Sequence, residues 1–379
     1  MRLLRLAALV LFVAAFTASS AHAGRHRYAD PRDLGPYAVG HSVFDATDPA
    51  RDRTLRTEVW YPVDPDDAVG EPTFYDFQFL GLGLVSPVAI EDAPITADTW
   101  RPLVVFSHGS CGVSFQSTPL MEHLASHGFV VVAPNHKGNT VNECLGGGGD
   151  PFAVSAADRP ADVSFLIDLF LAKTMDPDDA FFARVNPFAV GVAGHSFGGY
   201  TAIAMATGID APSLGLHVEP DPRVRAIAPI APASEFFSDA ELASIRVPMF
   251  LLGGTIDDTT PIEPNTTRPW ELASARPIYR ADLIGAGHLH FANACAIGQA
   301  LLDFGVPERQ IGNYVPGYDD TCGADDFPIE EAQRLESFYV TAFFKRTLLH
   351  DDRYDAFLSP DYAAANEPLV AYSRKDPTP

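Results

Sequence analysis

Short apolar runs alternate with helix-like segments along most of this chain. The runs are apolar on both faces, as is typical of strands buried inside a parallel sheet; they span residues 102–106, 129–133, 188–193, 224–230, 247–252 and 278–284. Apolar positions recur with helical spacing in other segments, at 117–127, 158–173, 200–207 and 330–349. This alternation predicts an α/β fold with a mostly parallel central sheet and helices on both faces.

The remaining pattern adds one strand and two loops. Residues 55–61 alternate between apolar and polar and are bounded by Pro62, as a strand would be. Residues 65–94 are rich in turn formers and acids, which predicts a surface excursion, and the four glycines at 146–149 predict a mobile loop. Because no linker or internal repeat divides the chain, we expect one domain with insertions over residues 24–379.

The first 23 residues have the pattern of a secretory signal peptide. Arg2 and Arg5 form a basic start, residues 6–16 are apolar but short for a bilayer, and residues 21–23 (Ala-His-Ala) resemble a cleavage site. No later stretch is long and apolar enough for a membrane span. We therefore expect a secreted or periplasmic protein without a stable membrane anchor.

Acidic side chains strongly outnumber basic ones. The formal charge of the whole chain is −23, and it becomes −25 without the signal segment, which contains two arginines and no acid. Such a surface repels nucleic acid and anionic lipid, so neither is expected as a partner. The charge identifies no substrate, and the sequence leaves the oligomeric state open.

An even number of cysteines in an exported chain favours disulfides; the four are Cys111, Cys144, Cys295 and Cys322. Three pairings are possible, and no Cys-x-x-Cys unit indicates zinc. The loops after strands 102–106 and 129–133 should emerge at the same edge of the sheet. We therefore predict the pairs Cys111–Cys144 and Cys295–Cys322.

One serine lies among glycines between a predicted strand and a predicted helix. The segment Gly194-His195-Ser196-Phe197-Gly198 has the Gly-x-Ser-x-Gly pattern of a nucleophile elbow, a tight turn that exposes the serine at the start of a helix. The strand and helix around the motif make it more specific than its letters alone, and a glycine-rich packing turn is the alternative. Ser196 is therefore the candidate nucleophile.

A serine nucleophile needs a base and an acid, which in this architecture follow it in the order Ser, acid, His. Asp257 and Asp258 come soon after strand 247–252, at the carboxyl edge of the sheet where ligands bind. We expect Asp257 to be the acid, because in similar hydrolases the acid lies four residues before a proline, here Pro261. Asp258 is then a turn or N-cap residue.

His288 is the candidate base. It follows strand 278–284 and a Gly-Ala-Gly loop that can bring it over the serine. His290 is expected to support the site or line the pocket. A metal site at His288 and His290 is the alternative, but no carboxylate motif and no His-Glu-x-x-His sequence accompanies them. We therefore expect neither a metal nor a cofactor.

Two backbone amides are needed to stabilise the oxyanion of acyl transfer. One is expected from Phe197, directly after the nucleophile. The other is expected from the glycine-containing loop 106–112, where Ser110 is our choice and Cys111 the alternative. His108 in the same loop is expected to hold the loop rather than to act in catalysis.

Several motifs together resemble a known family. "FSHGSCG", "LASHGFVVVAPNHKGNT", "RPADVSFLIDL" and "GHSFGG" are similar to secreted α/β-hydrolases described as predicted dienelactone hydrolases, close to the platelet-activating-factor acetylhydrolases. The resemblance extends from about residue 35 to residue 290. It implies an α/β-hydrolase fold, a serine carboxylic-ester hydrolase and no cofactor, with Ser196 as nucleophile and the amides of Phe197 and Ser110 as oxyanion donors.

The sequence departs from that family in two respects. Dienelactone hydrolases use a cysteine nucleophile, whereas this chain has Ser196. In the platelet-activating-factor enzymes the acid follows the strand after the nucleophile helix, where this chain offers only Glu235. The expected acid, Asp257, lies one strand later, as in cutinase-like polyester hydrolases.

We therefore expect a small-molecule ester substrate, either a short-chain or an acetylated phospholipid-type ester, cleaved through an acyl-enzyme. Loops 116–120 and 145–152 are expected to line the entrance, and activity should fall as acyl chains lengthen, because no long apolar lid is evident. A cutinase-like polyester hydrolase is the first alternative, and a peptidase is also open. A non-catalytic binding protein is the alternative from another class, although all triad residue types are present in order.

Overall fold

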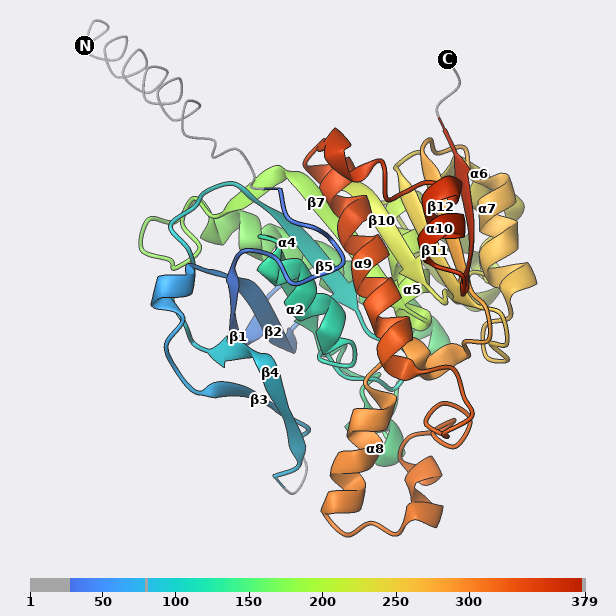
Figure 1. Cartoon of the computed structure of the whole chain (residues 1–379), viewed down its shortest axis with the longest axis horizontal. Coiled ribbons are helices and arrows are strands. Elements are labelled where there is room, and N and C mark those ends of the chain that lie inside the picture. The colour runs from blue at the N-terminus through green and yellow to red at the C-terminus, as the bar shows by residue number, and fades with distance from the viewer. Residues whose placement is uncertain (1–27, 79–80, 377–379) are drawn as a thin grey trace, which may run out of the picture.

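The computed structural model describes residues 28–78 and 81–376, and the candidate signal peptide lies outside them. A sheet of eleven strands runs through this part of the chain (Figure 1), in the order β13-β12-β11-β10-β7-β5-β6-β2-β1-β4-β3. Its middle is parallel and consists of β6 (Val130–Pro134), β5 (Arg101–Ser107), β7 (Val185–His195), β10 (Val224–Ile230), β11 (Met249–Gly254) and β12 (Ile278–Leu283). The predicted mostly parallel sheet is therefore confirmed.

Further strands extend both sides of this parallel core. β2 pairs antiparallel with β6, β1 antiparallel with β2, β4 parallel with β1, and β3 antiparallel with β4. At the opposite edge β13 pairs antiparallel with β12, and β8 and β9 form a small separate sheet. These strands are β1 (Ala38–Asp48), β2 (Arg53–Val63), β3 (Pro72–Asp76), β4 (Gly83–Glu91), β8 (Ile209–Ala211), β9 (Leu216–Val218) and β13 (Val370–Lys375).

The surface excursion expected at residues 65–94 is wrong, because this segment contributes β3 and β4 to the main sheet. β3 is the edge strand and β4 lies next to it, and exposed and buried positions mix along both, so that turn formers and acids dominate the pattern. The sequence pattern also gives no prediction of β1. The predicted strand at residues 55–61 lies within β2.

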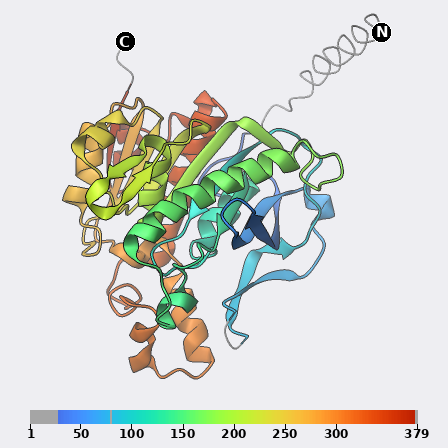
Figure 2. The ribbon, with the colours of Figure 1, turned by 180° about the vertical axis from the view of Figure 1, so that it is seen from behind.

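Helices cover both faces of the sheet. α2 and α9 pack on the face toward the viewer in Figure 1, whereas α4 lies on the face seen in Figure 2. The longer helices are α2 (Thr118–Ser126), α4 (Phe152–Lys173), α5 (Phe197–Thr207), α8 (Ala294–Asp303) and α9 (Ile329–Leu348). The shorter ones are α3 (Val141–Leu145), α6 (Asp239–Ser244), α7 (Arg268–Leu272) and α10 (Pro360–Asn366).

Successive side chains of β5 point alternately into the two helical layers that cover the sheet. Val104 and Phe106 belong to the hydrophobic cluster that α2 and α9 complete, whereas Leu103 and Val105 belong to the cluster of α4 and α5. All four side chains are fully buried, as expected of a central parallel strand. The carboxyl end of β5 is thereby held rigidly at the edge where the candidate site lies.

Residues 294–322, which we name the α8 segment, extend beyond the edge of the sheet (Figure 1). The segment begins with α8, and its apolar side chains Leu301, Ile311 and Val315 cluster with Leu82 from the β3–β4 hairpin. The sequence analysis did not identify this apolar cluster, and the expected fall in activity with longer acyl chains stays a prediction. Among the described residues no helix has both the length and the apolar character needed to cross a membrane.

Candidate active site

Ser196 lies in the turn between β7 and α5, with φ 59° and ψ −117°. A positive φ is uncommon for serine and marks a strained turn. A Cβ at Gly198 would come within 1.7 Å of the Ser107 carbonyl oxygen, and one at Gly194 within 2.3 Å of the Gly198 oxygen. Only glycine fits at both flanking positions, so the motif has the close packing that a nucleophile elbow requires.

Asp257 follows β11 and is almost completely buried. Its Oδ1 accepts the amides of Thr259 and Thr260 at 2.8 and 2.7 Å, and its Oδ2 faces His288 Nδ1 at 2.7 Å. Burial raises the pKa of Asp257, but the hydrogen bonds from His288 and Thr260 outweigh it and hold the pKa below its ordinary value. The carboxylate is therefore ionised near neutral pH.

The other two candidate acids are not part of this contact. Asp258 is exposed and borders the pocket, and Glu235 is exposed on the loop after β10. Of the three carboxylates, only Asp257 hydrogen-bonds His288 among the described residues. The geometry supports the choice of Asp257 that was made from the spacing to Pro261.

His288 begins a short helical turn after β12. Hydrogen bonds fix both its ring, through Asp257, and its backbone carbonyl group. Its carbonyl oxygen accepts a hydrogen bond from His195 Nε2 at 2.9 Å. His195 Nδ1 lies 3.1 Å from Gln116 Nε2, and Gln116 Oε1 accepts the Gly109 amide at 2.9 Å. Side chains thus connect the candidate base to the oxyanion loop, a connection that the sequence analysis missed.

Burial, followed by the nearby His288, lowers the pKa of His195 to about 3. The ring is therefore neutral, which allows it to donate through Nε2 and accept through Nδ1. Its position between glycine and serine in the motif was the available signal. Two polar residues, Gln116 and His195, belong to the supporting structure of the site.

His290 and His108 both have local structural contacts. His290 accepts the Gly287 amide at 3.0 Å and lies 3.1 Å from the Phe327 carbonyl oxygen. His108 Nε2 accepts the His136 amide at 3.0 Å, and its Nδ1 lies 2.7 Å from the Gly109 carbonyl oxygen. In the described part of the chain, no group of three His, Cys, Asp or Glu side chains is arranged to hold a metal ion.

The candidate oxyanion loop runs beside the nucleophile. A Cβ added to Gly109 would lie 3.4 Å from the Cβ of Ser196, so the loop passes directly along the serine. Among the described residues the amides of Ser110 and Cys111 have no hydrogen-bond acceptor. Ser110 is exposed on the pocket side, and Cys111 has a positive φ of 55°.

Both predicted disulfides are present. Cys111 is bonded to Cys144 in α3, and Cys295 at the start of α8 is bonded to Cys322. The first joins the oxyanion loop to α3, which also lines the cavity. The second joins the two ends of the α8 segment.

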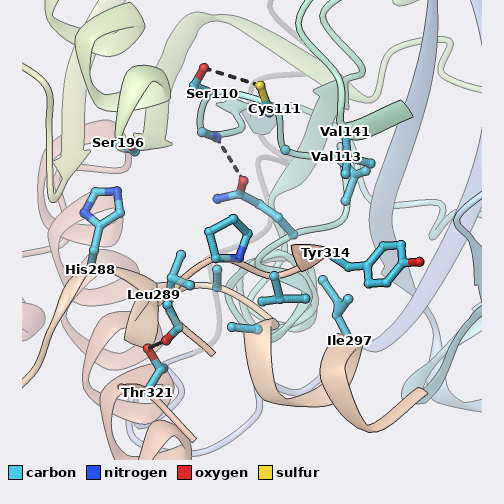
Figure 3. A pocket seen from close by; sticks show the side chains of 18 of the residues that line it. Ser110, Cys111, Val113, Val141, Ser196, His288, Leu289, Ile297, Tyr314 and Thr321 are labelled. Atoms are coloured by element: carbon cyan, nitrogen blue, oxygen red, sulfur yellow. Dashed lines mark hydrogen bonds between the residues drawn. The ribbon is translucent and has the colours of Figure 1, made fainter. Parts of the chain in front are cut away.

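Ser196, His288 and Ser110 border a cavity of about 1410 Å³. Figure 3 shows Ser196 and His288 on one side of it, with Val141, Ile297 and Tyr314 on the other. The α8 segment contributes much of the apolar wall, together with Leu289. Apart from His195 and His288, the ionisable lining residues among those described are Tyr314, Asp258, Asp320 and Asp326, because Cys111 is in a disulfide. Only Gln116 of the expected entrance loop 116–120, and only residues 145 and 146 of loop 145–152, line this cavity.

Comparisons with known proteins find a family and relatives to which this chain is similar. A family model described as Chlorophyllase matches residues 85–219, which include Ser110, Ser196 and Phe197. Cutinase 2 of Thermobifida cellulosilytica is 24% identical over 257 residues, covering 68% of this chain and 72% of that protein. Cutinase cut1 of Thermobifida fusca has the same identity, but the match covers only 59% of its length.

The sheet topology and these likenesses define an α/β-hydrolase fold. The likenesses also indicate a carboxylic ester hydrolase. They support an α/β-hydrolase esterase family in general, and the resemblance to dienelactone and platelet-activating-factor hydrolases stays a prediction.

Proposed function

We propose that this protein is a serine esterase whose catalytic triad consists of Ser196, His288 and Asp257. The hydrogen bond between His288 Nδ1 and the buried carboxylate of Asp257 carries this proposal, because it leaves Nε2 available as a base on the side of Ser196. The strained elbow and the unpaired amide at Ser110 support it.

The reaction proceeds through an acyl-enzyme. Ser196 Oγ attacks the ester carbonyl carbon while His288 Nε2 takes its proton, and Asp257 stabilises the imidazolium without accepting that proton. The negative oxygen is stabilised by the amides of Ser110 and Phe197. His288 then gives its proton to the departing alcohol, and water repeats the sequence at the acyl carbon to release the acid and regenerate Ser196.

The preferred substrate is an uncharged ester with a sizeable apolar group. The cavity of about 1410 Å³ exceeds the roughly 300–1,000 Å³ of ordinary ligand pockets, so an acetyl group alone would leave it mostly empty. Its walls are apolar, and among the described lining residues no Lys or Arg is available to bind an anion. The likeness to cutinases favours a second candidate, hydrolysis of a polyester chain that enters the same cavity.

Replacing the nucleophile tests the proposed function. Ser196→Ala should reduce kcat toward a p-nitrophenyl ester by roughly a million-fold, as in comparable serine hydrolases, and should abolish labelling by a fluorophosphonate. Ser238→Ala is the matched control, because Ser238 caps the exposed end of α6 and does not line the cavity. Near-normal activity of folded Ser196→Ala protein would refute the triad.

A further inference from the structure

A buried arginine lies directly behind the oxyanion loop. Arg159 on α4 is completely inaccessible to solvent. Its Nη1 donates to the His108 carbonyl oxygen at 2.5 Å and lies 3.2 Å from Ser107 Oγ. Its Nη2 donates to the Gly109 carbonyl oxygen at 2.9 Å, and Nη2 and Nε both donate to Asn139 Oδ1, at 2.6 and 3.1 Å.

These contacts use the whole guanidinium fork. An arginine has five N–H donors, and here the acceptors are two carbonyl oxygens of the loop, a hydroxyl and an amide oxygen. No carboxylate hydrogen-bonds Arg159 among the described residues, and Asp162, one turn along α4, instead binds His136 and Arg53. A buried charge without a directly bonded counterion is unfavourable for stability, so packing alone does not explain this residue.

The contacts fix the orientation of one particular peptide unit. The Gly109 carbonyl oxygen accepts Arg159 Nη2, His108 Nδ1 at 2.7 Å and the Gly112 amide at 3.2 Å. Because a trans peptide is planar, its N–H points opposite to its carbonyl oxygen. Three donors that hold the Gly109 oxygen on the inner side therefore direct the Ser110 N–H outward, toward the cavity that Ser110 borders.

The preceding peptide unit is held as well, but its amide is already used. The His108 oxygen accepts Arg159 Nη1, while the Gly109 N–H donates to Gln116 Oε1. Gly109 therefore cannot supply an oxyanion donor in this arrangement. Ser110 supplies the next amide of the loop that is free of an acceptor.

Arg159 also touches the other half of the oxyanion hole. Its guanidinium carbon lies 4.5 Å from the centroid of the Phe197 ring, in a cation–π contact. Phe197 is itself almost completely buried, and its amide follows the nucleophile. One side chain therefore contacts both the peptide unit that carries the Ser110 amide, through the Gly109 oxygen, and the ring of Phe197.

We propose that Arg159 is the positioning residue of the oxyanion hole. It holds the Ser110 amide and Phe197 so that both amides lie within hydrogen-bonding distance of the negative oxygen of the tetrahedral intermediate. This inference rests on the proposed esterase function and deepens it. Lysine cannot replace the arginine, because an ammonium has three donors on one nitrogen and cannot reproduce five hydrogen bonds directed by a planar fork.

The test compares Arg159→Lys and Arg159→Gln with Arg101→Lys, well below each variant's melting temperature. Arg101 is the matched control, since it is also buried, lies at the opposite end of β5, and stacks on Tyr37 with 4.6 Å between guanidinium carbon and ring centroid. We expect both Arg159 variants to lose about 10- to 100-fold in kcat with KM nearly unchanged, because complete loss of one oxyanion donor removes about 10²–10³ and a misplaced donor loses only part of that. Arg101→Lys should lower the melting temperature and keep kcat.

A second readout separates positioning from stability. A trifluoromethyl ketone that forms a tetrahedral adduct with Ser196 should bind the Arg159 variants more weakly, in proportion to their loss in kcat/KM. If Arg159→Gln does not yield folded protein, Arg159→Lys decides the question.

Folded Arg159→Lys with normal kcat and normal ketone affinity would overturn the role of Arg159. If Ser196→Ala is inactive in the same assay, the esterase function survives that result. An active Ser196→Ala protein would overturn both proposals.

Discussion

Acidification should strongly destabilise this protein at a pH where its carboxylates are still largely ionised. Burial lowers the pKa of His123 and His136 to about 4 and that of His127 and His195 to about 3. Burial also lowers the pKa of His108 well below its ordinary value. The folded protein therefore keeps these rings neutral between about pH 4 and pH 6.5.

The unfolded chain binds protons that the folded protein cannot accept. An unfolded histidine titrates near pH 6.5, so the stabilisation is complete above that pH and is lost as the pH falls toward the folded pKa. At pH 5.5 each buried histidine has lost about 1.4 kcal/mol, and four of them together about 5.6 kcal/mol. A typical domain has only about 5–15 kcal/mol of unfolding free energy, so a loss of this size is a large part of the total stability.

Urea unfolding at pH 7.5, 6.5 and 5.5 measures this loss of unfolding free energy, provided that the m-value is the same at each pH. His123→Asn should reduce the loss between pH 7.5 and 5.5 by about 1.4 kcal/mol, because one buried ring is removed. His350→Asn, at an exposed position after α9, is the matched control and should leave it unchanged. A free energy of unfolding that is flat over this range would refute the reasoning.

Three further predictions concern the site. Asp257→Asn should lower kcat roughly 10⁴-fold without unfolding the protein, whereas Asp258→Asn should change kcat only a few-fold. The reverse ranking in one esterase assay would identify Asp258 as the acid. Cys144→Ser opens a loop with a sequence separation of 33 and should lower the unfolding free energy by about 3.7 kcal/mol in urea titrations; an unchanged midpoint would contradict this. Neutral esters should have a higher kcat/KM than matched anionic ones, with a smaller difference at high salt; preference for the anion at low salt would reveal a cationic site.

The strands next to the candidate site were the most predictable elements from the sequence. A strand buried on both faces has a continuous apolar run, and all six such runs correspond to parallel strands of the sheet. The order of the elements then brings the ends of β7, β11 and β12 to one edge. This is why Ser196, Asp257 and His288 could be selected before any geometry was known.

The parts that the sequence analysis missed lack a local pattern. β4 lies near the edge of the sheet and contains Pro87, so its alternation is weak. The apolar side of α8 packs on Leu82, which is distant in sequence, rather than on the sheet. Arg159 is a charged residue within a helical pattern, which normally indicates a solvent-facing position, and only its distant carbonyl partners reveal that it is buried.

The bond between Cys295 and Cys322 makes the wall of the cavity an exchangeable module. The Cα atoms at its two ends are 5.5 Å apart, so a replacement of different length or composition can leave and rejoin the scaffold at the same place. The proposed nucleophile, base and acid all lie outside this module. Grafting another sequence between the two cysteines is therefore a route to a new substrate range that leaves the proposed triad in place.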